Sequence, residues 1–313
     1  MPELLWLSLT ALLYDRTSGS CIALAEGLET GSHDRLTRRL QGDGSGPTLL
    51  AVAWRTLLVW QQGYLISDDP VMPTPCAVAI EGLAWVFSRQ ERTPGDGLSL
   101  VLLVWTNGTL QIPRGMRLWR KGGPSKYELA LEFLSSARPR LRCHPDSVLC
   151  EAWYPSRALL KRIGDDGGAV VCRLNKTRRF KGHAVRHHQR PPYWAEIGGL
   201  SGGLKGLVVR YGKKDYATNR RTLSAAEGRR LYRRRAQIEE VIRVCQAHRA
   251  LTGCQARSQK AQQHHLTCCL VAFCVLAWAQ HDRQLSSYKL TRQLSFKGRS
   301  QALPALERLR RAA

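Results

Sequence analysis

The spacing of apolar residues changes about a fifth of the way along the chain. Residues 1–60 have the spacing of helices, and they include a short basic helix at 35–40 that Ser32 or Asp34 caps. Further on, the apolar residues form short continuous runs, which are typical of strands buried on both faces of a sheet. The pattern therefore predicts a helical N-terminal region, residues 1–60, and a sheet-containing core over residues 61–280.

The core has the order strand, strand, strand, helix, strand, helix, strand. The five predicted strands lie at residues 64–66, 98–105, 110–119, 148–150 and 169–172. Asn107-Gly108 predicts a hairpin between the second and third strands. Ser125 and Glu128 form a capping box that opens the first helix of the core. This order indicates an α/β fold.

A strongly basic segment follows the last of these strands. Residues 173–221 contain 13 Lys and Arg side chains but only two acidic ones, and they are interleaved with Tyr193, Trp194, Tyr211 and Tyr216. Predicted strands at 207–209 and 216–218 make this segment a β-rich insertion. Basic residues mixed with aromatics suit a nucleic-acid surface, and the alternative is a solvated insertion without a specific partner. The candidate DNA contacts within it are Arg178, Arg179, Lys181, Lys213 and Lys214.

The last third of the chain is helical. Ser224 and Glu227 form a second capping box, which opens one long helix predicted to run to about Arg249. The longest apolar run, residues 266–279, is shorter than the ~20 residues that a membrane span needs, so we expect a buried helix. A basic tail, residues 281–313, ends the chain.

The charge of the chain narrows the class of partner. Its 313 residues carry 48 Lys and Arg against 24 Asp and Glu, a formal net charge of +24. A chain this basic is drawn to a polyanion, and arginine suits phosphate. A membrane surface is the rival polyanion, but the sequence has no lipid anchor, basic amphipathic anchor helix or signal peptide. We therefore expect a nucleic-acid partner and no membrane.

The ten cysteines are scattered, most of them inside apolar runs, and no Cys-x-x-Cys pair occurs. We therefore expect neither a disulfide framework nor a structural zinc site, and a reducing compartment fits. His264, His265 and Cys268 have the spacing to ligate a metal from one helix face. The interpretation that we favour is that they are helix residues near a core.

Three acidic residues stand where a catalytic centre can form. Asp68 follows the first predicted strand and Glu151 follows the fourth, so their carboxylates meet at one sheet edge if these strands are parallel neighbours. Glu239, on the long helix, can lie beside them. Clustered carboxylates repel one another unless they surround cations, and such ligands suit Mg²⁺ or Mn²⁺. Each acid also has a structural interpretation, as a turn, strand-end or solvated helix residue.

The long helix carries further candidate residues. Tyr232, Arg235 and Glu239 lie at i, i+3 and i+7, so a helix presents them on one face, with Gln246 close to it. Arg235 is placed to contact a phosphate next to the metals, and Tyr232 to stack on a base or bond a phosphate oxygen.

These motifs resemble those of the insertion-sequence-4 class of DDE transposases, including relatives of the insertion-sequence-701 kind. The run Asp68-Asp69-Pro70 is similar to their Asp-Asp-Thr motif, and Glu151-Ala152-Trp153-Tyr154 to their Asp-Ser-Trp-Tyr motif. Their Tyr-x2-Arg-x3-Glu-x6-Lys signature is matched by Tyr232, Arg235, Glu239 and Gln246. The resemblance covers about residues 30–280.

The resemblance implies a ribonuclease H-like mixed sheet flanked by helices, with the β-rich insertion before the catalytic helix. It implies an enzyme that cuts double-stranded DNA at terminal inverted repeats and joins the 3′ ends to target DNA, within a homodimer. Asp68, Glu151 and Glu239 would be the catalytic residues and the ligands of two Mg²⁺ ions, with Mn²⁺ as a substitute. Asp69 is the nearest alternative to Asp68. Tyr232 and Arg235 would contact phosphate. The protein would be prokaryotic, cytoplasmic and associated with the nucleoid.

Three positions depart from the family pattern: Pro70 replaces Thr, Gln246 replaces Lys and Glu151 replaces Asp. Glutamate moves the charge out by one methylene, and a displacement of ~1 Å in an active site can cost on the order of a hundredfold in rate. The alternative function is therefore a decayed transposase that binds DNA without cutting it. A resolvase-like nuclease is disfavoured by the Tyr-Arg-Glu row. Residues 1–60 are either a DNA-contacting domain or a helical cap on the core.

Overall fold

A computed structural model places most of the chain. It describes residues 9, 12–13, 20–27, 32–42, 46–57, 63–75, 77–88, 92–137, 147–151, 157–165, 168–177, 179–180, 183–187, 193–196, 205–248, 251–283, 308 and 311. Two predicted DNA contacts, Arg178 and Lys181, lie outside these residues, and so do Trp153, Tyr154 and nearly all of the tail at 281–313.

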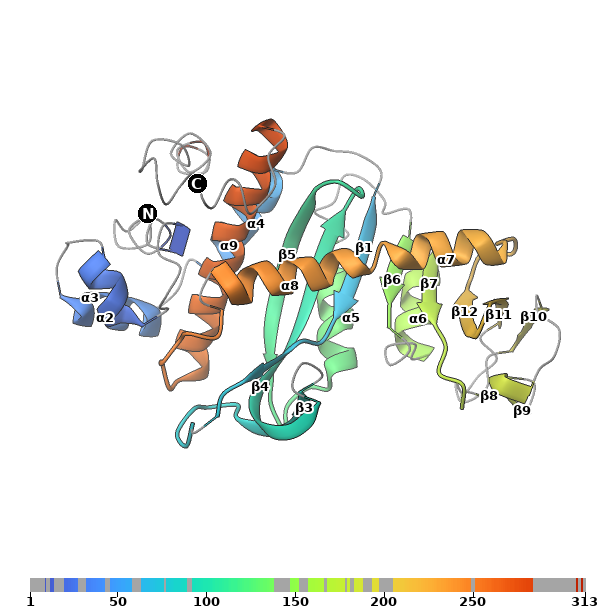
Figure 1. Cartoon of the computed structure of the whole chain (residues 1–313), viewed down its shortest axis with the longest axis horizontal. Coiled ribbons are helices and arrows are strands. Elements are labelled where there is room, and N and C mark those ends of the chain that lie inside the picture. The colour runs from blue at the N-terminus through green and yellow to red at the C-terminus, as the bar shows by residue number, and fades with distance from the viewer. Residues whose placement is uncertain are drawn as a thin grey trace.

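Ten strands of the described chain form one mixed sheet (Figure 1). Its order is β10 (Tyr193–Glu196), β11 (Lys205–Tyr211), β12 (Lys214–Thr218), β7 (Val170–Arg173), β6 (Ser147–Cys150), β1 (Tyr64–Asp68), β4 (Thr93–Thr106) and β2 (Val71–Pro73). Two more strands also pair with β4, namely β3 (Ala84–Ser88) and β5 (Gln111–Trp119). β1, β6 and β7 run parallel, and β4 and β12 run antiparallel to their neighbours in this group. The predicted α/β class is confirmed as a mixed sheet with helices.

The predicted hairpin at Asn107-Gly108 is confirmed. β4 and β5 pair antiparallel around it, and the apolar run of β4 is buried throughout. The Asn107 side chain accepts hydrogen bonds from the amides of Thr109 and Leu110, at 3.0 and 2.9 Å, which closes the turn. Gly108 has a φ of +104°, a conformation that favours glycine. Turn chemistry and apolar patterning therefore agree here.

Two helices cover the rear face of the sheet, α5 (Lys126–Ala137) and α6 (Arg157–Asp165) (Figure 1). The capping box that opens α5 is present. The Ser125 amide donates to the Glu128 carboxylate at 2.6 Å, and the Glu128 amide donates to the Ser125 hydroxyl at 3.3 Å. Phe133 and Leu134 are buried against the sheet, where each contributes on the order of 2 kcal/mol from the removal of apolar surface from water.

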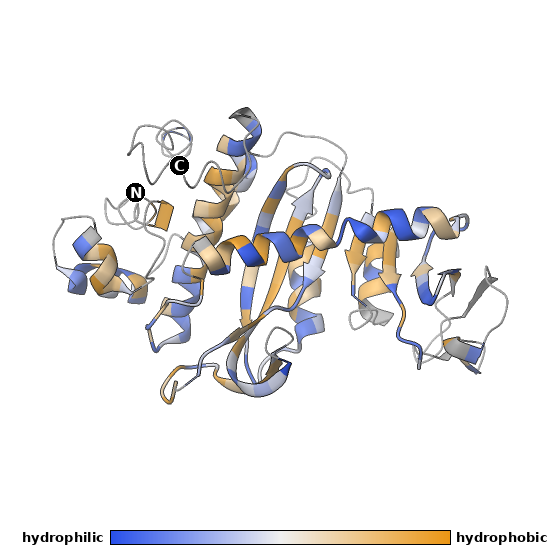
Figure 2. Ribbon diagram, in the orientation of Figure 1, coloured by the Kyte–Doolittle hydropathy of each residue, from blue (hydrophilic) through white to orange (hydrophobic). Residues whose placement is uncertain are grey.

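The apolar run at 266–279 lies within α9 (Gln259–Arg283), a helix buried on nearly every side. It packs against β5 and against α4 (Gly46–Leu57), whose Trp54 is fully buried in the same core (Figure 2). Two short helices, α2 (Cys21–Gly27) and α3 (His33–Gln41), form a small separate cluster. In the described part of the chain, no helix is long and apolar enough to cross a bilayer.

The histidines of α9 have packing partners. His264 Nδ1 lies 2.7 Å from the carbonyl oxygen of Leu40, which ties α9 to α3. His265 Nε2 lies 3.4 Å from the sulfur of Cys269. Cys268 is buried, and burial raises the pKa of its thiol. These contacts favour the core interpretation of His264, His265 and Cys268 over a zinc site.

The single long helix predicted from Ser224 to about Arg249 is wrong. Two helices replace it, α7 (Ala225–Arg233) and α8 (Ala236–His248). The amide of Arg235 donates to the carbonyl of Tyr232 at 3.0 Å, and the amide of Ile238 to that of Arg235 at 3.1 Å. These are i to i+3 bonds, so the chain tightens into a 3₁₀-like turn between the helices.

Contacts to the sheet hold this break in place. The side-chain amide of Gln237 donates to the carbonyl oxygen of Gly108, and its oxygen accepts from the Thr106 hydroxyl at 2.7 Å. On the other side of the turn, the guanidinium of Arg235 is drawn to acidic side chains at the end of β1. Tertiary contacts therefore override the helical periodicity, which is continuous across this point.

β2 and β3 are strands that the sequence did not predict. Pro70 does end β1, but pairing with β4 resumes at once in β2. The 173–221 segment is β-rich as expected, because it contains β10, β11 and β12 together with a small hairpin of β8 (Arg179–Phe180) and β9 (His183–Ala184). A 3₁₀ turn, η2 (Val185–His187), follows the hairpin.

Candidate active site

Asp68 and Glu151 lie side by side at one edge of the sheet. β1 and β6 are parallel neighbours with Ser67 opposite Cys150, so the residues that follow are adjacent. This is the arrangement that the sequence hypothesis required. The Oδ1 atom of Asp68 accepts a hydrogen bond from the Asp69 amide at 3.0 Å, which turns its Oδ2 atom toward Glu151 and α8.

The guanidinium of Arg235 joins all three predicted acids. Its Nη2 atom lies 3.0 Å from Asp68 Oδ2 and 2.7 Å from Glu151 Oε1, and its Nη1 atom lies 2.6 Å from Glu239 Oε1. The Arg235 side chain is 6% exposed, whereas those of Glu151 and Glu239 are 20% and 61% exposed. The three carboxylates therefore surround one buried cation, with Glu239 at the solvent side.

Burial and charge shift the pKa values of this cluster. Burial, together with the nearby Glu151 and Asp69, raises the pKa of Asp68 to about 6, although Arg235 opposes the rise. Burial acts to lower the pKa of Arg235, but Asp68 and Glu151 outweigh it and raise that pKa above its ordinary value. Arg235 is therefore permanently charged, and Asp68 is the carboxylate most sensitive to its surroundings.

A cavity of about 610 Å³ opens beside the cluster. Asp68, Glu239 and Gln246 line it, and β3 contributes Phe87, whose ring is more than half exposed. Lys126 lies on its wall and pairs with Asp69, with 2.7 Å between Nζ and Oδ2. Asp69 is thus committed to a lysine, which favours Asp68 over Asp69 as the first acid of the site.

The donor set suits a divalent cation, but the ligands are not preassembled. Among the described residues, no three His, Cys, Asp or Glu side chains are close enough together to hold a metal ion. The carboxylates nevertheless point at one positive group, and they are the hard oxygen ligands that Mg²⁺ and Mn²⁺ prefer. Binding of ions by Asp68, Glu151 and Glu239 would require the Arg235 guanidinium to move away from them.

The other predicted DNA contacts are spread over the surface. Lys213 and Lys214 are exposed at the turn between β11 and β12, and Arg179 begins β8. Tyr232 is half-buried, with its ring centroid 5.3 Å from that of Tyr216. Burial raises the pKa of Tyr232, so its hydroxyl stays protonated and can donate a hydrogen bond. Tyr232 lies close enough to the site to interact with Arg235 and Glu151.

Sequence reasoning gave no role to two residues that line the cavity. Lys126 is the first residue of α5, and this position was the available signal, because the helix dipole disfavours a cation there unless a carboxylate offsets it. Phe87 belongs to the strand that was not predicted. The available signal was the run Trp85-Val86-Phe87, because aromatic and β-branched residues are enriched in strands.

Comparisons with known proteins show the family of the chain. The family model for the transposase DDE domain matches residues 96–275, more than half of the chain, and this range includes Glu151 and Glu239. The chain is similar to a solved piggyBac transposase, determined by cryo-EM as a synaptic complex with hairpin DNA. The TM-score is 0.55 at 11% identity, over 99% of this chain and 72% of that one. No protein with a curated description matches. The family match shows that this chain belongs to the DDE transposases, the enzymes of DNA transposition and recombination.

Proposed function

We propose that this transposase belongs to the insertion-sequence-4 class, cuts double-stranded DNA at terminal inverted repeats and joins the 3′ ends to target DNA. One observation carries the proposal. Asp68 and Glu151 follow adjacent parallel strands, and Glu239 from α8 meets them at a shared guanidinium. Three carboxylates gathered at one guanidinium supply the ligands that metal-dependent phosphoryl transfer needs, once they close around cations.

A ribonuclease H-like core is part of this proposal. The strand order β5–β4–β1–β6–β7 supports it, with β4 antiparallel to β1 and β5, and with β6 and β7 parallel to β1. The strands β8 to β12 lie between Glu151 and Glu239 in the sequence, where the class carries its insertion. The piggyBac complex supports DNA as the partner and synapsis of transposon ends as the setting, and we propose a homodimer there.

Asp68, Glu151 and Glu239 would hold two divalent cations, Mg²⁺ by preference and Mn²⁺ as a substitute. Bound there, the ions would activate the attacking water or 3′-hydroxyl and stabilise the leaving oxygen. Arg235 offsets part of the negative charge of the three acids, and once displaced from them its fork of donors suits a phosphate oxygen. Lys126 holds Asp69 away from the site, and Tyr232 offers a donor beside it.

A second function is favoured by specific observations. Arg235 lies among the acids, Glu239 is largely exposed, and glutamate stands at position 151 where the class has aspartate. A decayed transposase that binds DNA without cutting it would look like this. The two functions differ in whether the acids can close around cations.

Nicking of supercoiled plasmid in Mg²⁺ and in Mn²⁺ tests both functions. The proteins are wild type, Glu239→Gln, Glu151→Asp and Glu240→Gln. Glu240 is the matched control, because it adjoins Glu239 but pairs with Arg243 on the solvent side. We expect wild type and Glu240→Gln to nick and Glu239→Gln to be inactive. Nicking by Glu151→Asp alone would establish the decayed transposase, and nicking by none of them would overturn the assignment of the site.

A further inference from the structure

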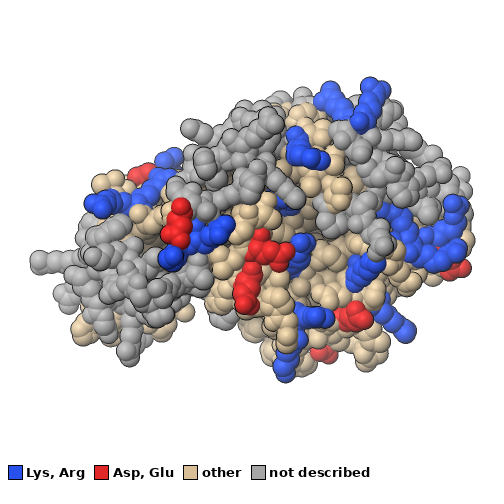
Figure 3. Space-filling view, turned by 180° about the vertical axis from the view of Figure 1, so that it is seen from behind, with Lys and Arg blue, Asp and Glu red and all other residues tan. Residues whose placement is uncertain are grey.

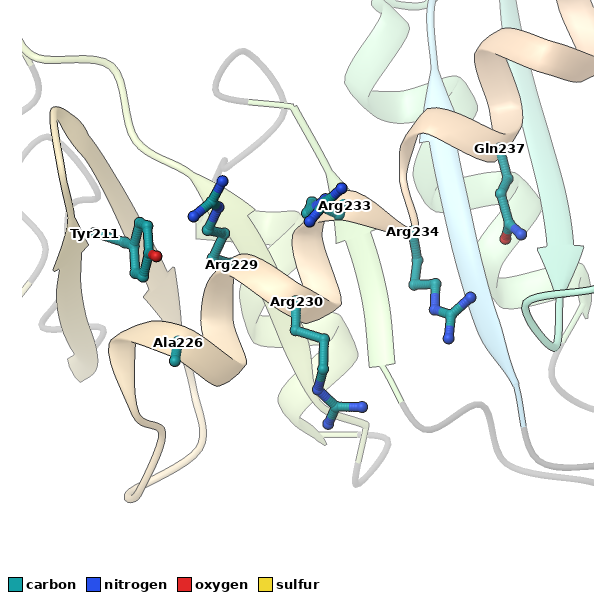
Figure 4. Close-up of a pocket in the computed structure, with 7 residues that line it drawn as sticks. All are labelled: Tyr211, Ala226, Arg229, Arg230, Arg233, Arg234 and Gln237. Carbon is teal, nitrogen blue, oxygen red and sulfur yellow. The ribbon is translucent and has the colours of Figure 1, made fainter.

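Four exposed arginines form an open groove along α7. Arg229, Arg230 and Arg233 lie on the helix, and Arg234 lies in the turn that follows (Figure 4). With Tyr211 from β11 and Gln237 from α8 they enclose about 490 Å³. We call this surface the arginine groove. It contains none of the residues assigned above to DNA contact or catalysis.

The charges of the arginine groove have no acidic partner in the part of the chain that the structure describes. Among the described residues, no carboxylate forms an ion pair with any of the four arginines, although nearby Arg210 and Arg220 pair with Asp215 and Glu227. Two pairs within the groove, Arg229 with Arg233 and Arg230 with Arg234, are like charges four residues apart, which weakens a helix. The helix dipole favours cations at the C-terminal end of α7, but it does not account for four arginines close together there. A bound anion would relieve the repulsion.

Close packing fixes both ends of the groove. A side chain at Gly228 would come within 3.2 Å of Val209, so glycine lets α7 lie directly on β11. There the guanidinium of Arg229 lies 4.3 Å from the ring centroid of Tyr211. At the other end, a side chain at Gly108 would come within 2.7 Å of the Arg234 guanidinium. Two of the arginines are therefore positioned by the fold.

The arginine groove and the acidic cavity lie near opposite ends of β1. Arg234 projects toward the hairpin at Gly108, where Tyr64 at the start of β1 pairs with Thr106. Arg235, the next residue, projects toward Asp68 at the other end of that strand. An anion in the groove is therefore separate from the reacting phosphate. The rear face of the molecule, in contrast, carries basic and acidic patches intermingled (Figure 3).

We infer that the arginine groove binds the phosphate backbone of duplex DNA at a segment away from the reaction centre. The inference rests on the proposed function, because it takes DNA to be the substrate. Guanidinium groups grip phosphate through two donors at once, and their charge displaces counterions from a duplex. Gln237, the one amide side chain that lines the groove, is already bonded to Gly108 and Thr106, so it adds no contact to a base.

The test is the salt dependence of DNA binding. Fluorescence anisotropy with a labelled duplex of roughly 30 base pairs is measured in EDTA, so that no cleavage enters the result. The variant changes Arg229, Arg230, Arg233 and Arg234 to Gln. The control removes four exposed charges elsewhere, by changing Arg55, Arg120, Lys121 and Lys161 to Gln.

We expect the groove variant to bind DNA at least about tenfold more weakly near 0.15 M salt. The slope of log affinity against log salt should fall by roughly 0.9 for each phosphate that the variant no longer neutralises, up to about 3.6, and by less than about 1 in the control. Thermal unfolding should show the groove variant to be within about 1 kcal/mol of wild type, because the lost contact of Arg229 with Tyr211 is offset by the removal of repulsive pairs. Equal slopes in the variant and wild type would overturn the inference.

The outcomes separate this inference from the proposed function. If wild type binds DNA with a steep salt slope and the groove variant does not, the groove stands even when wild type fails to nick plasmid. If wild type nicks plasmid and the groove variant keeps the full slope, the enzyme stands and the groove does not. A wild type that shows no salt-dependent binding would overturn both.

Discussion

Arg235 Nη2 lies 2.7 Å from Glu151 Oε1, and the same nitrogen lies 3.0 Å from Asp68 Oδ2. One buried donor thus bridges two carboxylates that follow neighbouring strands. The Arg235 Nε atom is buried as well, without a hydrogen-bond partner in the described structure. Arg235 therefore holds the acids through its two terminal nitrogens, Nη2 to Asp68 and Glu151 and Nη1 to Glu239. Removing the guanidinium leaves Asp68 and Glu151 facing each other.

Arg235→Met is expected to destabilise the protein by about 3–5 kcal/mol, because it leaves Asp68 and Glu151 as uncompensated charges. Millimolar Mg²⁺ should restore part of that stability, since a cation then has free access to the acids. Thermal unfolding in EDTA and in Mg²⁺ measures both effects. Arg243→Met is the control, because its exposed pair with Glu240 should change stability by about 1 kcal/mol or less. Equal destabilisation of the two variants would contradict the bridging role.

The contribution of Asp68 to the stability of the protein in EDTA is expected to fall as pH rises from about 4 to about 6. Asp68 has an ordinary pKa of 3.8 and a folded pKa of about 6, so the folded state binds more protons than the unfolded state across this window. The 2.2-unit difference corresponds to about 3 kcal/mol, present below pH 4 and lost by about pH 6. Urea unfolding of wild type and Asp68→Asn measures the difference, which should not change with pH if the Asp68 carboxyl is unperturbed.

Gly115→Ala is expected to destabilise the protein by about 1–3 kcal/mol. A methyl group there would lie 2.6 Å from the buried ring of Phe133, so α5 would have to move away from β5. Gly95→Ala is the matched control, because a methyl group at that strand position meets nothing within 4 Å. Denaturant unfolding compares the two. Phe133→Leu should recover part of the stability in the Gly115→Ala background and none in the Gly95→Ala background.

The Lys126–Asp69 pair is expected to show a coupling energy of about 1–3 kcal/mol in a double-mutant cycle of Lys126→Met and Asp69→Asn. Both side chains are less than one-fifth exposed, and the pair is 2.7 Å long, so solvent screens it little. The exposed pair Lys161–Asp165 should show about 0.5 kcal/mol or less. Similar coupling in both cycles would mean that burial at the cavity wall adds nothing to the first pair.

Much of the fold was predictable because several elements are encoded by neighbouring residues. Asn107-Gly108 closes its turn with its own side chain, and the Ser125 and Glu128 capping box needs no distant partner. The buried runs of β4 and β6 signalled strands with both faces covered. Glycine, asparagine and capping residues therefore gave the boundaries with little dependence on tertiary structure.

The remaining features depend on contacts between distant residues. The break between α7 and α8 is held by Gln237 at the hairpin and by Arg235 at the acids, which lie far away in sequence. The sequence placed the candidate acids at the ends of strands. It could not show that Arg235 is their common partner, because that contact depends on the pairing of β1 with β6. The arginine groove was not predicted either. Tyr211 belongs to β11, and it lies beside Arg229 of α7 only because the fold packs this strand against this helix.

The continuous sheet also limits which segments can be exchanged between related proteins to make chimeras. β12 pairs with β7 in a fixed register, Tyr216 opposite Arg173, so the inserted strands and the strands that carry the acids share one hydrogen-bond ladder. An insertion exchanged between relatives would have to preserve this edge pairing, or it would expose the open edge of β7 to aggregation. The inserted strands are consequently hard to exchange between relatives as a unit. Chimeras joined within β12 should express less well than chimeras joined at the turn between β11 and β12.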